Sequence, residues 1–415
     1  MKRPILLVAI SLLILGACRT DSGKNGVELH KENGHSFLYV DLDQATDTID
    51  FNITNLVDSC QLIRLENSKE ATIDRISQIS FSKDRIYVYN QEHYIMAFDW
   101  EGKYREQIGN LGQGPFEYIY INNMAVGGDP AMILGQPHHI KDYLLFDTSG
   151  KGRTTITRRL DGLQKVMITE NNEVIEIGYP NYPYQHGDSR NIMLCINSRD
   201  GQLRLEKNPL YQAECYHFLP LSFYRFDDHY RVHFSRDTLF DLNTSNGLLS
   251  PVAVFTASVN GINYQQLEKE ISSGSKIMCT EGKVYIEVHA ETSEYYLIRE
   301  MKKHQDKDGY AVSDAISYFC IDKKRMKANP VRLIDPFWGM DLNRDRGPIM
   351  ANRWKIVDNR YGVLAFQGIE LKDELEQRLK DRSLPPTVIA RLQNLDRSVS
   401  QDDNEFLFVY HLKNK

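Results

Sequence analysis

The stretch FDWEGKYREQIG (residues 98–109) decides the fold, because its arrangement returns twice further along the chain. An apolar run leads into a tight turn that ends in Gly102, and a more polar run follows. FDTSGKGRTTI (146–156) and NSRDGQLRLEK (197–207) repeat this order, with their turn glycines spaced by 48 and 51 residues. Gly at the end of such a turn is typical of β-hairpins, since Gly adopts a positive φ without a steric penalty.

Strand-like patterns dominate the region between residues 36 and 366. The chain contains 23 Tyr and 17 Phe, and many of them alternate with β-branched residues, as in KVYIEVHA (283–290). A further hairpin, such as ISQISFSKDRIYVYN (76–90), precedes the repeated unit. Four antiparallel strands in about 50 residues are the signature of a β-propeller blade. Blades bury their apolar faces only by stacking radially around an axis.

The sequence therefore predicts one all-β domain, a six-bladed β-propeller of four-stranded antiparallel blades. We expect SCQLIRLE (59–66) to join the last blade and close the ring, so that no strand edge is left open at the seam. The six blades are expected at residues 72–110, 118–162, 163–212, 213–257, 274–335 and 347–414.

Two segments have a helical pattern. In the segment 370–397, leucines recur every fourth residue from Leu371, and Pro385-Pro386 ends the run. This predicts a small helical insertion, with a second helix near 387–395. NYQQLEKEI (263–271) also suggests a short helix.

The N-terminus, MKRPILLVAISLLILGAC (1–18), has the features of a bacterial lipoprotein signal. Its uncharged run is too short for a membrane-spanning helix, which needs about 20 residues, and it ends in small residues before Cys18. We expect a signal peptide at 1–17, a lipid on Cys18, a flexible tether at 18–35 and the propeller at 36–415. The membrane partner is then the lipid alone.

Charge and cysteine usage exclude two classes of function. Without Lys2 and Arg3 the formal charge changes from −6 to −8, which is unsuited to nucleic-acid binding. The cysteines beyond Cys18 form no C-x-x-C pair, which excludes zinc-knuckle and thioredoxin-type motifs. Cys195 and Cys320 lie in apolar runs and are expected to be buried.

A glycine-rich corner, IGNLGQGPFEY (108–118), separates the first two predicted blades. It lacks the Lys-Ser or Lys-Thr of a phosphate-binding loop, and a strand rather than a helix follows Pro115. The corner resembles G-x-x-G-x-G-P-x-E-Y in a family of lipid-anchored six-bladed β-propellers from Gram-negative bacteria, with TolB-like or NHL-like architecture. The matching residues are Gly109, Gly112, Gly114, Pro115, Glu117 and Tyr118.

Two further segments carry the same resemblance. HFSRDTLFDLN (233–243) is similar to a mid-chain strand of that family, and QDDNEFLFVYHLK (401–413) is similar to its C-terminal strand, with Glu405 where Pro is usual. The resemblance implies a location in the cell envelope, anchored to the outer membrane. It implies no activity, because function is mostly unestablished in that family.

Two loops carry candidate ligand contacts. GYPNYPYQHGDSR (178–190) offers proline-pinned aromatic side chains, which suit a binding loop; a loop that only caps the propeller mouth is the alternative. The predicted contacts in this loop are Tyr179, Tyr182, Tyr184 and His186.

DPFWGMDLNRDRGP (335–348) is the second loop. Trp338, Arg344 and Arg346 are candidates for stacking on a sugar or binding a carboxylate. A linker with an anchoring aromatic residue is the alternative. The spacing of Asp341, Asn343 and Asp345 suggests a loose calcium site, although an EF-hand is excluded because Arg346 occupies the position that needs Gly.

The sequence favours a monomeric binding module for a glycan, a peptide or a partner protein, without a required cofactor. A hydrolase or lyase that acts on a carbohydrate, with a metal in the central channel, is the alternative. No nucleophile motif or zinc signature supports an enzyme, so a non-enzymatic role is preferred.

Overall fold

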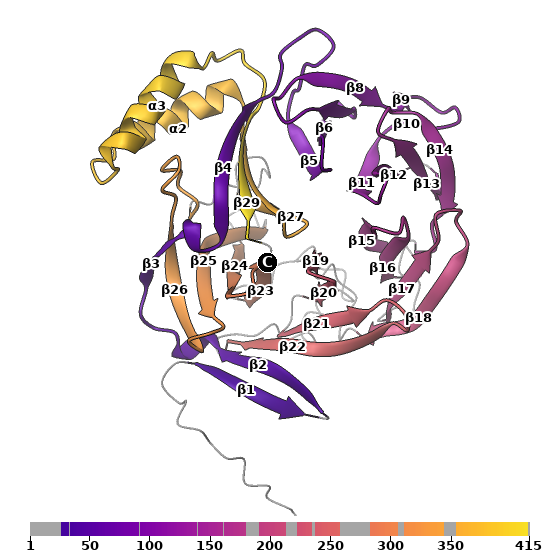
Figure 1. The fold of residues 1–415 in the computed structure, drawn as a ribbon, viewed down its shortest axis with the longest axis horizontal. Helices are drawn as coiled ribbons and strands as arrows, with labels where there is room; N and C mark the ends of the chain where they lie inside the picture. Colours follow the sequence, from indigo (N-terminus) through magenta and orange to yellow (C-terminus); the bar gives the residue numbers. More distant parts are fainter. Residues whose placement is uncertain are drawn as a thin grey trace, which may run out of the picture.

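The computed structural model shows six small sheets arranged around a central axis (Figure 1). This confirms the predicted six-bladed β-propeller, and each predicted blade range coincides with one sheet. The structure describes residues 26–413 except 33, 91, 139, 161, 180–190, 213–221, 235–236, 258–282, 306–310 and 344–353.

The first three blades have four antiparallel strands each, numbered here from the centre outward. Blade 1 contains β5 (Ile76–Phe81), β6 (Ile86–Asn90), β7 (Ile95–Phe98) and β8 (Tyr104–Ile108). Blade 2 contains β11 (Ile121–Gly127), β12 (Met132–Pro137), β13 (Asp142–Asp147) and β14 (Gly152–Thr157). Blade 3 contains β15 (Gly162–Ile168), β16 (Val174–Tyr179), β17 (Asn191–Asn197) and β18 (Leu203–Gln212).

The last three blades each include strands from the N-terminal segment. Blade 4 contains β19 (Ser222–Phe226), β20 (His229–His233), β21 (Thr238–Asn243), β22 (Leu248–Thr256), β2 (His35–Asp41) and β1 (Val27–Glu32). Blade 5 contains β23 (Lys283–Glu291), β24 (Tyr295–Gln305), β25 (Ala311–Asp322), β26 (Lys327–Ile334) and β3 (Ile49–Asn52). Blade 6 contains β27 (Lys355–Val357), β28 (Tyr361–Phe366), β29 (Phe406–Leu412) and β4 (Val57–Arg64).

The ring closes as the sequence predicts. Strand β4 pairs antiparallel with β29, from Arg64 opposite Phe406 to Val57 opposite Leu412. The N-terminal strand is thus the outermost strand of the C-terminal blade, which removes an open edge at the seam.

The other N-terminal strands were not predicted, and they correct the proposed tether. β1 begins at Val27, inside the segment 18–35 that was expected to be flexible. β1 and β2 form a hairpin around Gly34, and β2 runs parallel to β22, whereas β3 runs parallel to β26. Short 3-10 turns at Leu42–Gln44 and Ile53–Asn55 connect these strands. The segment therefore covers the outer edges of blades 4 and 5, which would otherwise offer unpaired backbone groups.

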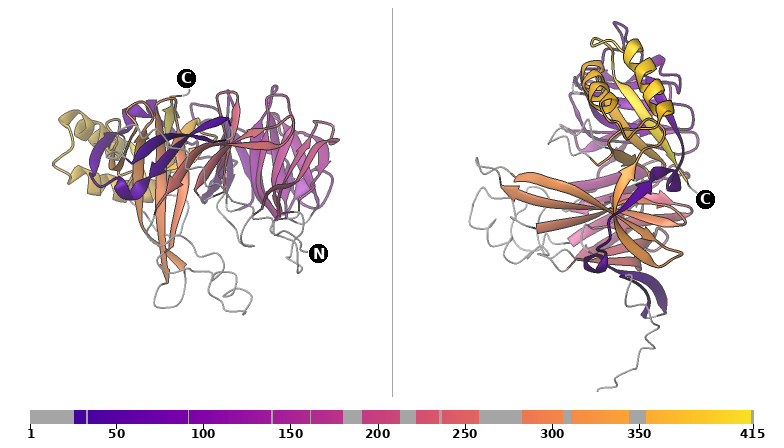
Figure 2. Two further views of the ribbon diagram at one scale, coloured as in Figure 1. Left: turned by 90° about the horizontal axis from the view of Figure 1, so that it is seen from below. Right: turned by 90° about the vertical axis from the view of Figure 1, so that its left-hand side faces the viewer.

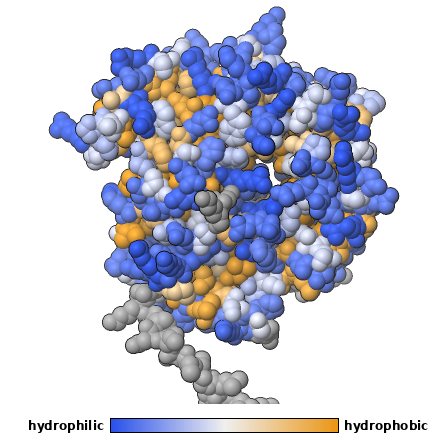
Figure 3. Space-filling view, viewed as in Figure 1, coloured by the Kyte–Doolittle hydropathy of each residue, from blue (hydrophilic) through white to orange (hydrophobic). Residues whose placement is uncertain are grey.

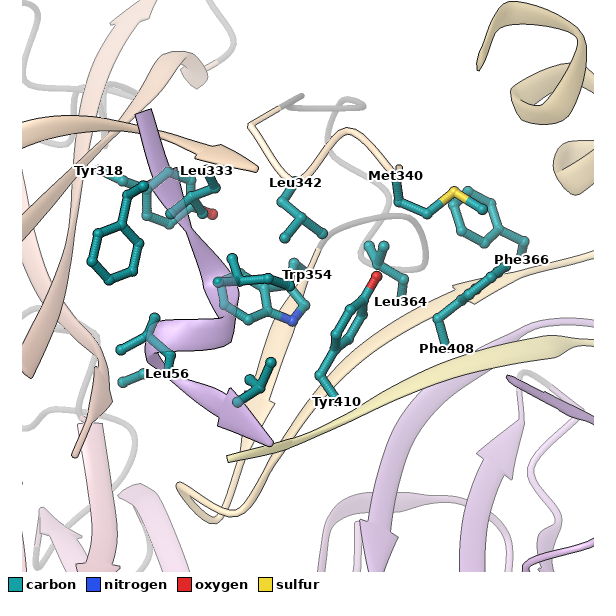
Figure 4. Packing of buried hydrophobic residues seen from close by; sticks show 14 of the residues in the cluster. Leu56, Tyr318, Leu333, Met340, Leu342, Trp354, Leu364, Phe366, Phe408 and Tyr410 are labelled. Atoms are coloured by element: carbon teal, nitrogen blue, oxygen red, sulfur yellow. The ribbon is translucent and has the colours of Figure 1, made fainter. Parts of the chain in front are cut away.

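The hydrophobic core lies between neighbouring blades, as a propeller requires. Figure 4 shows one such layer, where Trp354, Leu364 and Tyr410 of blade 6 meet Tyr318 and Leu333 of blade 5. Every residue of that layer comes from a strand face or a linker that points toward the next blade.

The predicted cysteine environments are also confirmed. Cys195 and Cys320 are buried in β17 and β25, and Cys60 is half-buried. None of these three cysteines forms a disulfide.

The helical insertion is confirmed as a pair of helices between β28 and β29, α2 (Gly368–Leu379) and α3 (Pro386–Ser398). A capping box between Gln367 and Glu370 begins α2, and Pro386 occupies the first turn of α3. In the part of the chain that the structure describes, neither helix is long and apolar enough to cross a membrane. The predicted helix at 263–271 lies outside the described residues.

The propeller has two unlike faces, which position the sites discussed below. The turns that join first to second and third to fourth strands lie on one face, here called the turn face; they include residues 82–85 and 99–103. The links between second and third strands, and those between blades, lie on the opposite loop face; they include residues 91–94 and 109–120. Figure 2 shows the two faces from the side.

Candidate binding site on the loop face

Four aromatic rings form a continuous row on the loop face between blades 1 and 2. The ring of Tyr120 stacks on His138, with 4.6 Å between centroids and 18° between planes. On its other side Tyr120 meets His93, at 5.7 Å and 40°. His93 in turn lies over Tyr89, at 6.3 Å and 28°. We call these four residues the aromatic ladder.

The glycine-rich corner positions the ladder. Tyr118 is fully buried, and its hydroxyl donates to the Ile108 carbonyl (2.8 Å) and accepts from the Ile95 amide (3.2 Å). Gly109 has a φ of +67°, and a Cβ there would lie 2.8 Å from the Phe146 ring. The corner is therefore a fixed support, as expected, and it directs the next residues toward the loop face.

Hydrogen bonds then hold the individual rings of the ladder. The His138 amide donates to the Tyr120 carbonyl at 3.1 Å. The Tyr89 hydroxyl accepts from the Ile121 amide at 2.8 Å and contacts Nδ1 of His93 at 3.1 Å. Burial raises the pKa of Tyr89, and the Ile121 amide partly opposes that shift.

The outer members of the ladder are accessible to a ligand. His93 and His138 are exposed, Tyr120 is half-buried and Tyr89 is 4% exposed. The ladder thus presents two imidazoles and a phenol beside one another, with carbon edges between polar atoms. Such a surface packs against apolar C–H groups and exchanges hydrogen bonds with hydroxyls.

The first predicted loop, 178–190, begins on the same face at the end of β16. Tyr179 is 1% exposed and packs in the core between blades 3 and 4, so it does not fit the predicted role of surface contact. Alternation along β16 turns this side chain inward. Tyr182, Tyr184 and His186 lie outside the described residues.

In the second predicted loop, Trp338 serves as a packing residue. It is partly buried, lies edge-on to Phe408 at 5.4 Å and faces the guanidinium of Arg391 on α3 at 5.4 Å. Asp335 accepts hydrogen bonds from the amides of Phe337 and Met340, at 2.9 and 3.1 Å. The loop is thereby folded beneath the helices. This agrees with the anchoring-linker alternative and leaves little of Trp338 for a ligand.

The suggested calcium ligands are engaged in the same loop. Asn343 Oδ1 accepts from the Leu333 amide at 2.8 Å, and Asp341 Oδ1 accepts from the Asn343 amide at 3.0 Å. Arg344, Asp345 and Arg346 are not among the described residues. Across the described ranges, no three His, Cys, Asp or Glu side chains are grouped as a metal site would need.

The sequence did not reveal the ladder. His93, Tyr120 and Tyr89 come from separate segments, and His138 was considered only as a metal ligand beside His139. The one available signal was their position, since each follows or precedes a strand that ends at the loop face.

Comparison with known proteins places the chain in a family. A family model described as a domain of unknown function, DUF4934, matches residues 37–411. The chain belongs to the DUF4934 family. The match covers every blade, including the N-terminal strands of blades 5 and 6.

Solved structures show the same fold in proteins of Bacteroides. A protein of Bacteroides fragilis NCTC 9343, described as exported, superposes with a TM-score of 0.64 over 90% of this chain and 99% of its own, at 15% identity. A DUF4221 family member from Bacteroides vulgatus ATCC 8482 gives a TM-score of 0.46 at 10% identity, over 94% of this chain and 100% of its own. No curated protein matches the DUF4934 chain.

Proposed function

We propose that this DUF4934 protein is an exported, lipid-anchored module that binds a carbohydrate through the aromatic ladder. The carrying observation is the row of His93, Tyr120 and His138, whose rings are exposed or half-exposed and fixed by backbone hydrogen bonds. Preorganised rings of this kind contribute contact area at low entropic cost.

The chemistry of the ladder favours sugars over peptides. A sugar ring has patches of C–H groups beside closely spaced hydroxyls, and the ladder alternates carbon edges with polar atoms at the same scale. Asn122 adds an amide near His138, at 3.5 Å from Nδ1. Sugar hydroxyls donate and accept, as do the neutral imidazole and the phenol.

The anchor supports a place in the cell envelope. The lipoprotein signal ends at Cys18, only eight residues before Gly26, where the ordered hairpin begins. The similar protein of Bacteroides fragilis is described as exported. We propose that the chain is a monomer held at the outer membrane by this lipid.

Binding to carbohydrate is tested with the mature chain from residue 19, prepared without lipid. Maltohexaose, mannohexaose and xylohexaose are titrated by calorimetry, and any cleavage is followed by chromatography. Tyr120→Ala should weaken the binding of at least one of them by about tenfold, because an aromatic contact typically contributes at least 1 kcal/mol. Release of shorter products would favour the hydrolase or lyase alternative.

Tyr39→Ala is the matched control. Tyr39 is also half-buried, and it stacks on His30 at 4.9 Å and 23°, but it lies on the β1–β2 hairpin, away from the loop face. It should leave affinity unchanged. Equal losses in both variants, or no binding to any of these sugars, would contradict the proposal.

The anchor is tested separately. Wild-type protein should incorporate a labelled fatty acid and fractionate with membranes, whereas Cys18→Ser should do neither. Membrane association of the Cys18→Ser protein would show that another part of the chain provides the anchor.

A further inference from the structure

A second polar groove lies on the turn face, between blades 2 and 3. It has a volume of about 670 Å³, within the range of small-molecule sites. Figure 3 views the turn face, which is mostly hydrophilic. The side chains that define the groove are those of Met132, Arg153, Thr154, Asn171, Glu173 and Arg199.

Turn geometry brings these residues together. Arg153 and Thr154 begin β14 directly after the turn that ends at Lys151. Asn171 and Glu173 lie in the turn between β15 and β16. Arg199 lies in the turn between β17 and β18, which is a repeat of the turn in blade 2. The groove thus depends on two successive blades.

The charges along the groove are largely balanced by neighbours. Arg153 pairs with Asp147, and Glu173 pairs with Arg204. Asp200 accepts from the Ser198 hydroxyl, and this hydrogen bond lowers its pKa. A ligand of either sign would therefore meet a like charge as readily as an opposite one.

We propose that this groove is a second carbohydrate site, which takes neutral sugar units. This deepens the proposed function and rests on it. Carboxylates that are already paired still accept hydrogen bonds from vicinal hydroxyls, and guanidinium groups donate to ring and hydroxyl oxygens. Thr154, Asn171 and the Ser198 hydroxyl add neutral partners, and buried Met132 gives the groove an apolar floor.

Arg199→Ala is the first test, because Arg199 is exposed and its loss leaves the strands intact. Maltohexaose, mannohexaose, xylohexaose and polygalacturonate are titrated against the mature chain from residue 19. Binding of the best neutral sugar at the groove should weaken about tenfold or more, as expected for a hydrogen bond from a charged group. Hydrogen exchange should slow at 152–156 and 198–204 when that sugar is added.

Arg325→Ala is the matched control, since Arg325 occupies the equivalent turn of blade 5 and its side chain is 81% exposed. It should bind as the wild type does. Loss of affinity on Tyr120→Ala but not on Arg199→Ala, with no protection at 152–156, would overturn the groove and leave the ladder standing. The reverse result would support the groove and overturn the ladder. Binding of polygalacturonate alone would overturn the assignment to neutral sugars.

Discussion

Replacing Glu405 with Gln should stabilise the propeller, and the gain should grow as the pH rises. Glu405 immediately precedes β29 and has no exposed surface. Neither of its carboxylate oxygens has a hydrogen bond of ordinary geometry within the described chain. Burial raises the pKa of Glu405 from 4.5 to about 8, and the nearby Glu370 carboxylate adds to this. The Ile76 amide and the Arg75 guanidinium oppose the shift without cancelling it.

The size of the effect follows from the two pKa values. Between pH 4.5 and about 8 the unfolded chain has lost a proton that the folded chain retains, so the free energy of unfolding falls as the pH rises. Each pKa unit corresponds to 1.36 kcal/mol. The cost is therefore about 3 kcal/mol at pH 7 and reaches an upper limit of about 5 kcal/mol above pH 8. Gln has the same shape and no charge to bury.

Urea unfolding at pH 5, 6, 7 and 8 measures this cost directly. The free-energy difference between Glu405→Gln and wild type should increase by about 1 kcal/mol per pH unit across this range. Glu376→Gln controls for the change in net charge, because Glu376 is 70% exposed on α2. A difference that stays constant with pH would refute the reasoning, since it would mean that Glu405 is equally ionised in the folded and unfolded chains.

Two further changes test the closure of the ring. Asn404→Ala should cost about 2–3 kcal/mol in urea unfolding, because the buried Asn404 amide donates to the Glu66 carbonyl at 2.6 Å and no water replaces it. Gly102→Ala should lower the melting temperature by several degrees, since a Cβ at this φ of +81° would lie 2.2 Å from the Arg64 carbonyl oxygen of the closing strand. Gly34→Ala has nearly the same φ, +82°, with nothing within 4 Å, and should cost much less. Similar losses at the two glycines would show that backbone strain alone matters.

Most of the fold could be predicted because each blade repeats a local pattern. The turn glycines, the alternation of apolar residues and the closing strand at 59–66 all act within a few residues or follow from the need to cover an edge. The strands β1, β2 and β3 were missed because VELHKE (27–32) is short and polar. Such a strand forms only where an uncovered edge such as that of β22 awaits it.

The sites were harder to predict than the fold. Trp338 and Tyr179 have the residue types of ligand contacts, yet both pack against neighbouring elements. Composition shows that an aromatic residue prefers contact with other groups, but not whether those groups belong to a ligand or to the protein itself.

The sequence by itself determined the number of blades, the seam and the helical insertion, because hairpin chemistry and strand alternation are local and the radial arrangement is what remains once every blade must cover its neighbours. Only the tertiary structure decided which side chains meet on the two faces. Tyr89, His93, Tyr120 and His138 come from three connections in two blades. Their contact depends on how far each turn extends beyond the sheets and on the angle between adjacent blades, and neither quantity is set by any one segment.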